Sequence, residues 1–288
     1  MGNCCFPEST ESKKYVSIKF PNSVEYITYN DAKKEFVRGN DISVWIHNLY
    51  YLSNFDNWVI YNDDYSKIAE KHVTKGHCKG IIAWSKYSIS WLCHSVPNYP
   101  RSFSGKFISA IENSEKIYGQ SFQYIEVPYT SNMLYNILHQ IHIMEANIYI
   151  NNYTSEFINY KNMIFPKIDK MNTIQITDTI IHIAKPPSLE IDIYGDYIAK
   201  GEHIWKVETW QRGHNIKTTN KNIIDINKIK FEDITFSESQ DHSKWATSDD
   251  KFYFIGDLNR MTSQFKRGGG GFICNDHDIA KALDKLII

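Results

Sequence analysis

Short β-rich runs separated by brief polar turns recur along this chain, and they restrict it to folds built mainly from antiparallel strands. Each run alternates apolar and polar residues or is continuously apolar, and two or three turn-forming residues follow it, which is the pattern of a β-hairpin. Three such pairs are predicted: 15–20 with 24–29 across "PNS", 79–85 with 89–95 across "KYS", and 244–248 with 252–257 across "DDK".

Other segments add single strands and a few helices. We expect strands at 57–63 and 122–127, and long strands at 173–184 and 203–211. Helical spacing predicts helices over 104–119, where Phe107, Ile108, Ile111 and Ile117 recur, over 132–144, and from Asp276 or Asp278 to the end of the chain. Because strands and helices do not alternate regularly, the fold class is predicted to be mixed α/β with a largely β centre.

The numbers of charged residues limit the partners that the chain can bind. Lys and Arg together number 32 against 33 Asp and Glu, so a polyanion would have to bind a local basic cleft rather than the whole surface. No apolar run approaches the roughly 20 residues of a membrane helix, and the sequence predicts no oligomeric state. Residues 148–172 are polar, contain Pro166 and form the best candidate for a connection between two halves.

The N-terminus and the cysteines indicate a reducing setting. Residues 1–13 lack the apolar core of a signal peptide, and Phe6 breaks the myristoylation pattern, so a flexible leader and a cytoplasmic location are favoured. No CxxC pair occurs among the cysteines, and free thiols are therefore expected, with a disulfide between Cys78 and Cys93 left open. The five cysteines are Cys4, Cys5, Cys78, Cys93 and Cys274.

A His-x-Lys pair occurs twice, at His77 and Lys79 and again at His242 and Lys244. With 11 His in 288 residues, chance alone gives about one such pair, so the motif gains weight only from its context. Each pair adjoins a predicted hairpin, and a polar residue follows 15 positions after each lysine, His94 in the first case and Asn259 in the second. This repetition predicts one composite site made by two similar halves.

Two facing His-x-Lys units suit the cleavage of a phosphodiester. Residues i and i+2 of a strand point to the same face, so each histidine can reach the same phosphate as its lysine. One neutral imidazole can attack phosphorus and form a phosphohistidine, while the other, protonated, donates to the leaving oxygen. Such chemistry needs no metal and favours an acidic pH optimum, because the two imidazoles must differ in protonation near their usual pKa of about 6.5.

At these residues the chain resembles the deoxyribonuclease II family. The blocks "GHCKGIIAW", "WLCHSVPNYP", "AKPPSLEIDIY", "VETW", "DHSKWA", "FIGDLNR" and "KRGGGGFIC" occur in the family order across about residues 57 to 274. The resemblance implies a phospholipase D-like fold, with pseudo-symmetric β-rich halves and flanking helices in one composite domain. It also implies metal-independent cleavage of DNA to 3′-phosphate and 5′-hydroxyl ends. The halves are expected at 14–160, with His77 and Lys79, and at 161–288, with His242 and Lys244.

The resemblance also implies roles for single residues. His77, Lys79, His242 and Lys244 match the catalytic motifs, with His77 favoured as nucleophile and His242 as general acid. Supporting or substrate-binding roles are expected for His94, Asn259, Asp241, Lys266 and Arg267, and no metal or other cofactor is implied. Two departures stand out: the chain starts with "MGNCCF" where the family has a signal peptide, and Phe254 replaces a family cysteine, so that Cys274 lacks its usual partner.

Several alternatives remain open at this point. The run "FKRGGGGF" fits either a phosphate cradle with Lys266 and Arg267 or a tight turn that only glycine allows. Lys185 and Arg260 are candidates for a DNA track. A zinc site from His77, Cys78, Cys93 and His94 has suitable ligand types but lacks the short structural spacing. The rival functions are a catalytically silent DNA-binding homologue and a phospholipase D-like enzyme acting on RNA or lipid.

Overall fold

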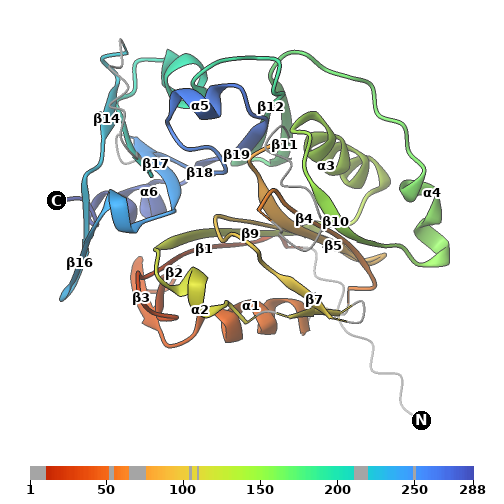
Figure 1. The fold of residues 1–288 in the computed structure, drawn as a ribbon, viewed down its shortest axis with the longest axis horizontal. Coiled ribbons are helices and arrows are strands. Elements are labelled where there is room, and N and C mark those ends of the chain that lie inside the picture. The colour runs from red at the N-terminus through yellow and green to blue at the C-terminus, as the bar shows by residue number, and fades with distance from the viewer. Residues whose placement is uncertain are drawn as a thin grey trace.

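The fold consists of two large sheets that pack against each other, as a computed structural model of the chain shows (Figure 1). The structure describes residues 11–51, 55–64, 76–103, 106–108, 110–210, 220–248 and 251–288. The eight-stranded sheet has the order β10 (Ile148–Asn152), β4 (Asn57–Asn62), β5 (Lys79–Trp84), β6 (Ser88–His94), β9 (Gln120–Pro128), β1 (Lys13–Lys19), β2 (Tyr26–Asn30) and β3 (Glu35–Gly39).

The second sheet comes from the C-terminal part of the chain. Its seven strands follow the order β11 (Asn172–Thr177), β12 (Ile180–Lys185), β19 (Gly269–Asn275), β18 (Phe252–Gly256), β17 (Lys244–Ser248), β13 (Trp205–Thr209) and β14 (Ile223–Asp225). Two small hairpins complete the strands: β7 (Arg101–Phe103) with β8 (Lys106–Ile108), and β15 (Lys228–Phe231) with β16 (Ile234–Ser237). The predicted mixed α/β, β-rich fold is confirmed.

The two sheets share an arrangement of five strands. In the first sheet, β4, β5, β6, β9 and β1 lie side by side, and each neighbouring pair is antiparallel. The second sheet places β13, β17, β18, β19 and β12 in the same sequence of neighbours, again all antiparallel. In each row the strand that comes first in the chain lies at one end and pairs with the strand that comes last: β1 pairs with β9, and β12 pairs with β19. The strands β5 and β17 hold the same place in the two rows, and each begins at the lysine of a His-x-Lys pair.

Three apolar clusters fill the spaces on either side of the sheets. The largest lies between the sheets and includes Trp91, Phe272, α3 (Ser131–Ile143) and α6 (His277–Asp284). A second cluster packs α1 (Ile42–Tyr51) against the outer face of the eight-stranded sheet, and a third covers the outer face of the other sheet. Because β5 and β6 are buried on both faces, they are continuously buried rather than alternating.

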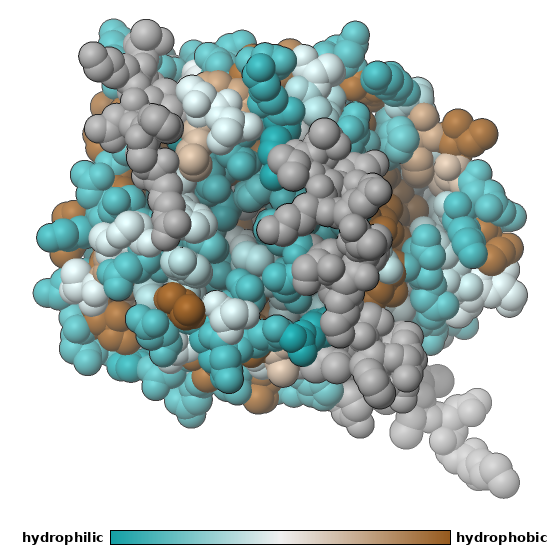
Figure 2. Space-filling model, in the orientation of Figure 1, coloured by the Kyte–Doolittle hydropathy of each residue, from teal (hydrophilic) through white to brown (hydrophobic). Residues whose placement is uncertain are grey.

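The remaining helices are short. They are α2 (Asn113–Lys116), α4 (Ile158–Lys161) and α5 (Thr262–Phe265), with 3-10 turns at Ser155–Phe157, Ile198–Lys200 and Glu238–Gln240 and a π-helical turn at Ile193–Tyr197. None of the helices in the described ranges has the length and apolar character needed to cross a membrane. The face shown in Figure 2 is mainly hydrophilic, with apolar residues in small groups among its coloured atoms.

Two sequence predictions about these elements are wrong. The predicted helix over 104–119 is a strand at Lys106–Ile108 and a single helical turn at Asn113–Lys116, with residues 104, 105 and 109 outside the described ones. Ile117, one of its apolar positions, is half exposed, so the helical spacing did not mark a buried face. The long strand predicted at 173–184 is a hairpin, β11 and β12, which turns at Asp178 and Thr179.

The other expected elements are found. All three predicted hairpins, the strands at β4, β9 and β13 and the helix α3 occur where the sequence placed them. The closing helix α6 begins after Asp276, whose carboxylate accepts the backbone N–H of Ile279 at 3.0 Å. The first ten residues of the predicted leader lie outside the described residues, and Lys13 already begins β1.

His182 joins the two sheets inside the largest cluster. Its imidazole packs 4.3 Å from the ring of Trp91 and 4.9 Å from that of Phe272. The Gln140 side-chain amide donates to Nδ1 of His182 at 3.0 Å, which requires an unprotonated Nδ1. Burial lowers the pKa of His182 to about 3, so the ring is neutral in the folded protein.

We expect this buried neutral histidine to make the protein less stable in acid. An unfolded histidine titrates near 6.5 and the folded one near 3, so between these pH values the unfolded chain binds more protons and stability falls as the pH falls. Replacing His182 by Gln should remove up to about 1.4 kcal/mol of this loss per pH unit between pH 6 and 4. Urea denaturation of both proteins across that range measures it. Parallel stability curves for the two proteins would contradict this assignment.

Candidate active site

The first His-x-Lys pair is anchored by the opposite sheet. The backbone N–H of His77 donates to the carbonyl of Gly268, the residue before β19, at 2.7 Å. Nδ1 of His77 lies 2.8 Å from the backbone carbonyl of Asp257. Because a carbonyl oxygen can only accept, the proton of a neutral His77 ring sits on Nδ1, and Nε2 keeps its lone pair. The fold therefore holds this imidazole as the tautomer in which Nε2 is nucleophilic.

Lys79 lies within a buried group of charges. Its Nζ is 2.5 Å from a carboxylate oxygen of Asp63 and 3.0 Å from one of Asp64, the two residues that follow β4. Arg267 contacts the other oxygen of Asp63 at 2.8 Å. Burial favours the neutral amine, but the two carboxylates outweigh it and raise the pKa of Lys79. Despite its own burial, Asp63 has a pKa below its usual value because Lys79 and other nearby cations stabilise its charge. Lys79 is thus permanently charged.

The second pair is anchored in the same way, with different surroundings. The backbone N–H of His242 donates to the carbonyl of Gly119, the residue before β9, at 2.9 Å. The backbone N–H of Lys244 donates to the Ser121 hydroxyl at 3.1 Å, and its Nζ donates to the His242 carbonyl at 2.5 Å. Burial and then the charge of Lys79 lower the pKa of Lys244 to about 7. The charges of Asp241, Asp63 and Asp64 favour its protonation, but no ion pair of Lys244 is found among the described residues, so Lys244 holds its proton far less tightly than Lys79.

Both pairs open onto one cavity. Its volume is about 350 Å³, and its walls come from both sheets. Burial and then the positive charge of Lys79 lower the pKa of His77 to about 3, so His77 is neutral even in mild acid. The residues that line the cavity are Asp64, His77, Lys79, Ser95, Pro97, Trp210, His242, Lys244, Asn259, Met261, Gln264 and Arg267.

Comparison with known proteins identifies the family of this chain. The family model described as Deoxyribonuclease II matches residues 39–288. The chain belongs to the deoxyribonuclease II family. Its relatives include Cell-death-related nuclease 7 of Caenorhabditis elegans, 28% identical over 92% of this chain and 78% of that protein, and Deoxyribonuclease-2-beta of Mus musculus, 29% identical over 84% and 74%. A Putative deoxyribonuclease-2 of Burkholderia pseudomallei is 28% identical over 79% and 70%.

This membership confirms the resemblance inferred from the sequence, and it makes the chain an enzyme, a nuclease of the hydrolase class. The family match covers both His-x-Lys pairs, β17, β18 and the glycine run. The distances and hydrogen bonds of the site are those of this chain's own residues.

Among the supporting residues expected for this deoxyribonuclease II family member, Asn259 lines the cavity and His94 does not. Asn259 is 7% exposed, and its side-chain oxygen has no hydrogen-bond partner among the described residues. His94 is fully buried at the end of β6, where its Nδ1 accepts from the backbone N–H of Val96 at 3.2 Å. Burial holds the pKa of His94 well below its usual value, so it braces the fold as a neutral ring.

The equal spacing of His94 and Asn259 from the two lysines is not a structural equivalence. Cys93 pairs with Gly80 in the first hairpin, so one further step of the register places His94 opposite Lys79. In the second hairpin Trp245 pairs with Ile255, and the same step places Gly256 opposite Lys244. Asn259 lies three residues beyond that position because the second hairpin, counted from the lysine to the residue opposite it, is shorter in its strands as well as in its turn.

Asp241 lies behind the site and supports its backbone. Its carboxylate accepts the backbone N–H of Ser243 at 2.9 Å, and burial raises its pKa to about 6. Of the two cations in the glycine run, Arg267 lines the cavity, while Lys266 is exposed 3.8 Å from Glu190. Both interpretations of this run are wrong, because residues 269–271 form β19. Glycine is needed there for close packing: a Cβ on Gly270 would lie 2.2 Å from the Ile183 carbonyl.

Lys185 and Arg260 are buried and do not form a DNA track. The Nζ of Lys185 donates to the carbonyls of Leu189 and Phe265 at 2.8 Å each. Arg260 is 1% exposed and contacts Asp192 at 2.9 Å and Asp225 at 2.6 Å. Both side chains stabilise loops around the second sheet.

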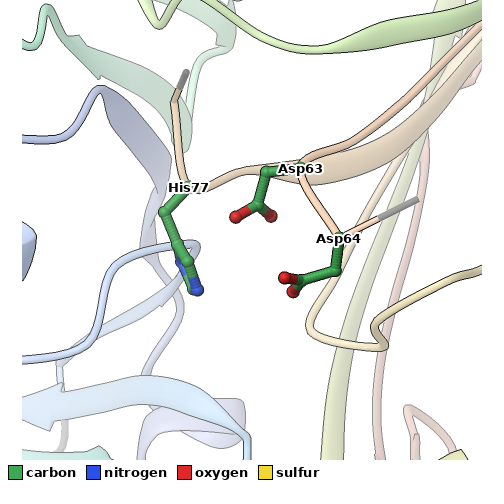
Figure 3. Close-up of side chains that lie close together, drawn as sticks. All are labelled: Asp63, Asp64 and His77. Atoms are coloured by element: carbon green, nitrogen blue, oxygen red, sulfur yellow. The ribbon is translucent and has the colours of Figure 1, made fainter. Parts of the chain in front are cut away.

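The described residues contain one group with the ligand types of a metal site, and it differs from the zinc site considered above. Figure 3 shows the carboxylates of Asp63 and Asp64 directed toward the imidazole of His77, and ligand atoms of the three lie within 4.8 Å of one another. Lys79 already occupies the position between the two carboxylates. Cys78 and Cys93 are free, buried thiols, as is Cys274, so the expectation of free thiols holds for these three.

Several residues of the site were not found by sequence reasoning. Asp63 and Asp64 end a predicted strand in "YNDD", but nothing local shows that they meet Lys79. Tyr118 and Trp210 stack on His242 from two other elements. Trp210 directly follows β13, the strand equivalent to β4. An alignment of the two halves would therefore have placed Trp210 at the position of Asp63.

A buried ion pair and an exposed one can be compared directly. Replacing Arg260 by Met leaves the carboxylate of Asp192 buried without its partner, and we expect this to lower the free energy of unfolding by about 3 kcal/mol. Lys266→Met removes a distant pair on the surface and is expected to cost less than about 1 kcal/mol. Urea denaturation at pH 7 measures both. Equal effects would show that Arg260 is not the structural cation described here.

Proposed function

We propose that this protein is a metal-independent DNA endonuclease that cleaves through a phosphohistidine and leaves 3′-phosphate and 5′-hydroxyl ends. The observation that supports it most directly is the asymmetry of two histidines at one cavity. His77 is held neutral with its Nε2 lone pair available, and His242 faces the same cavity from the other sheet. Opposite environments for two like groups are what a nucleophile and a general acid require.

In the first step, Nε2 of His77 attacks phosphorus and forms a P–N bond while the bond to the 5′-oxygen breaks. His242, as imidazolium, gives its proton to that leaving oxygen, which departs as a hydroxyl. The Nδ1 proton of His77 stays on its ring, and its hydrogen bond to the Asp257 carbonyl strengthens as the ring becomes positive. The DNA is then cut, with its 3′-phosphate attached to His77.

In the second step, the now neutral His242 takes a proton from water as the water oxygen attacks phosphorus. The P–N bond breaks, His77 returns to its neutral form, and the 3′-phosphate is released. His242 ends protonated, as it began, so each cycle consumes one water molecule and leaves the enzyme unchanged.

The two lysines are proposed to hold the phosphate differently. Lys79 is a fixed positive charge because of Asp63 and Asp64, and it attracts the non-bridging oxygens at any working pH. Lys244, with a pKa near 7, is charged in acid and loses its charge above neutral pH unless an anion in the cavity stabilises it. Asn259 lines the same space, where its side-chain NH2 group can donate to a phosphate oxygen and its unpartnered Oδ1 can only accept.

DNA as substrate is supported by the family and by the names of the relatives, several of which are deoxyribonucleases. We further propose a phospholipase D-like composite fold with halves at residues 14–160 and 161–288. The shared five-strand order of the two sheets supports it, as does the position of each His-x-Lys pair before the equivalent strand.

The two-histidine site can be tested by plasmid nicking in EDTA from pH 4.5 to 8. His77→Ala and His242→Ala should each reduce cleavage by at least about 10²-fold, because each removes the nucleophile or the general acid. His47→Ala is the matched control, since His47 is exposed on α1 and does not line the cavity. Labelling of the ends should find 3′-phosphate and 5′-hydroxyl.

Other outcomes separate the rival functions. Loss of wild-type cleavage in EDTA would refute the metal-independent mechanism and direct attention to Asp63, Asp64 and His77. DNA binding without cleavage at any pH would indicate a silent homologue. RNA and phosphatidylcholine assayed beside the plasmid test the remaining alternatives. If either is turned over faster than DNA, it replaces DNA as the proposed substrate.

The pH profile should extend far into acid. Because the pKa of His77 is lowered to about 3, the nucleophile stays unprotonated at pH 4.5, whereas cleavage is lost at high pH once His242 has given up its proton. We therefore expect kcat/KM to remain high at pH 4.5 and to fall on the basic side. A profile that instead declines steeply below pH 6 would rule out His77 as the neutral partner.

A further inference from the structure

Two aromatic side chains stack on the ring of His242. The phenol ring of Tyr118 lies 4.0 Å away at an interplanar angle of 9°, and the indole of Trp210 lies 3.8 Å away at 29°. The two aromatic rings also lie 5.4 Å from each other, so the three rings form one cluster. Tyr118 comes from the loop before β9, and Trp210 directly follows β13, so segments from both sheets build this cluster.

The other histidine of the site has a contrasting environment. No stacked aromatic ring accompanies His77 in the part of the chain that the structure describes. Its neighbours are the charged groups of Lys79 and Asp63, and a backbone carbonyl fixes its Nδ1. The two His-x-Lys units are therefore alike in sequence and backbone anchoring but differ in what surrounds the imidazole.

We propose that Tyr118 and Trp210 are positioning residues that stabilise the protonated form of His242 and restrain the orientation of its ring. This rests on the proposed function, in which His242 is the general acid. Aromatic faces carry negative charge density and attract a cation stacked on them, most strongly when water is excluded. His242 is 7% exposed, so this attraction is little screened.

The ring cluster also restricts the orientation of the imidazole. A ring that packs against two neighbouring rings has little room to rotate, so the directions in which its nitrogens can donate are restricted. The same two side chains therefore act on the proton and on its direction.

The charges around the cavity act on His242 in both directions. The cations disfavour its protonation and the carboxylates favour it, whereas the two rings favour the imidazolium whatever the ionisation state of the others. Five of the charged or titratable groups line the same cavity as His242: Asp64, His77, Lys79, Lys244 and Arg267. Three more lie near these: Asp63 pairs with Lys79 and Arg267, Asp241 precedes His242 in the chain, and Glu208 on β13 interacts with Lys244.

The test measures the pKa of His242 directly by NMR titration of the histidine Cε1–H signals, with His242→Gln used to assign the signal. Trp210→Leu and Tyr118→Leu should each lower this pKa by about 0.5 to 1 unit, from the usual strength of a cation–π contact. Trp210→Phe and Tyr118→Phe retain a ring and should shift it by less than half as much. The His182 signal, from the core between the sheets, serves as internal control.

The pH dependence of kcat/KM provides a second test. In the Leu variants the basic limb of the kcat/KM profile should move to lower pH by the same amount as the NMR pKa, while KM changes little. An unchanged or raised His242 pKa in the folded Leu variants, or equal shifts in the Phe variants, would overturn the proposal. Because the NMR pKa needs no turnover, an inactive wild-type protein would refute the proposed function, and the effect of the two aromatic rings on His242 could still be measured.

Discussion

Two backbone hydrogen bonds that cross between the sheets hold the site together. The N–H of the histidine in each His-x-Lys pair donates to the carbonyl of a glycine that precedes a strand of the opposite sheet: His77 to Gly268 and His242 to Gly119. Since these strands, β19 and β9, are the equivalent members of the two five-strand rows, the anchoring is reciprocal. Neither half contains a complete site, and the cavity exists only while the sheets remain packed.

Within this symmetrical frame, the two halves place very different groups around the same motif. The residues after β4 are Asp63 and Asp64, which keep Lys79 charged. At the equivalent place after β13 stands Trp210, which stacks on His242 and gives Lys244 no counter-charge. The carboxylates after β4 raise the pKa of Lys79, and the aromatic residue after β13 does nothing comparable for Lys244. This difference also separates the environments of the two histidines, and with it their proposed roles.

Local patterns in the sequence were enough for much of the fold. Hairpins and amphipathic helices depend on neighbouring residues, so β5 with β6, β17 with β18, α3 and α6 were predictable. The segment 104–119 was not, because its apolar spacing resembled a helix while its backbone serves distant partners: the carbonyl of Lys116 accepts from buried Lys19. Where tertiary contacts determine the backbone, periodicity alone misleads.

The site was predictable only as far as the motif itself. Both His-x-Lys pairs were recognised and are found at one cavity, but Asp63, Tyr118 and Trp210 reach it from distant parts of the chain. Composition also misled in the glycine run, where close strand packing rather than phosphate binding or a turn requires glycine. Burial, finally, cannot be read from residue type, and it makes Lys185 and Arg260 structural.

The buried charges explain how such a site can remain both stable and reactive. Removing Lys79 from water is costly, and the two carboxylates offset that cost before any substrate arrives. For Lys244 the carboxylates compensate only in part, so an anion that enters the cavity is a further favourable partner for its charge. One lysine thus provides a permanent positive field that attracts a phosphodiester, and the other contributes most when the phosphate is bound. In this arrangement the cation that faces Asp63 and Asp64 is a side chain of the protein itself, and its charge is in place before the reaction begins.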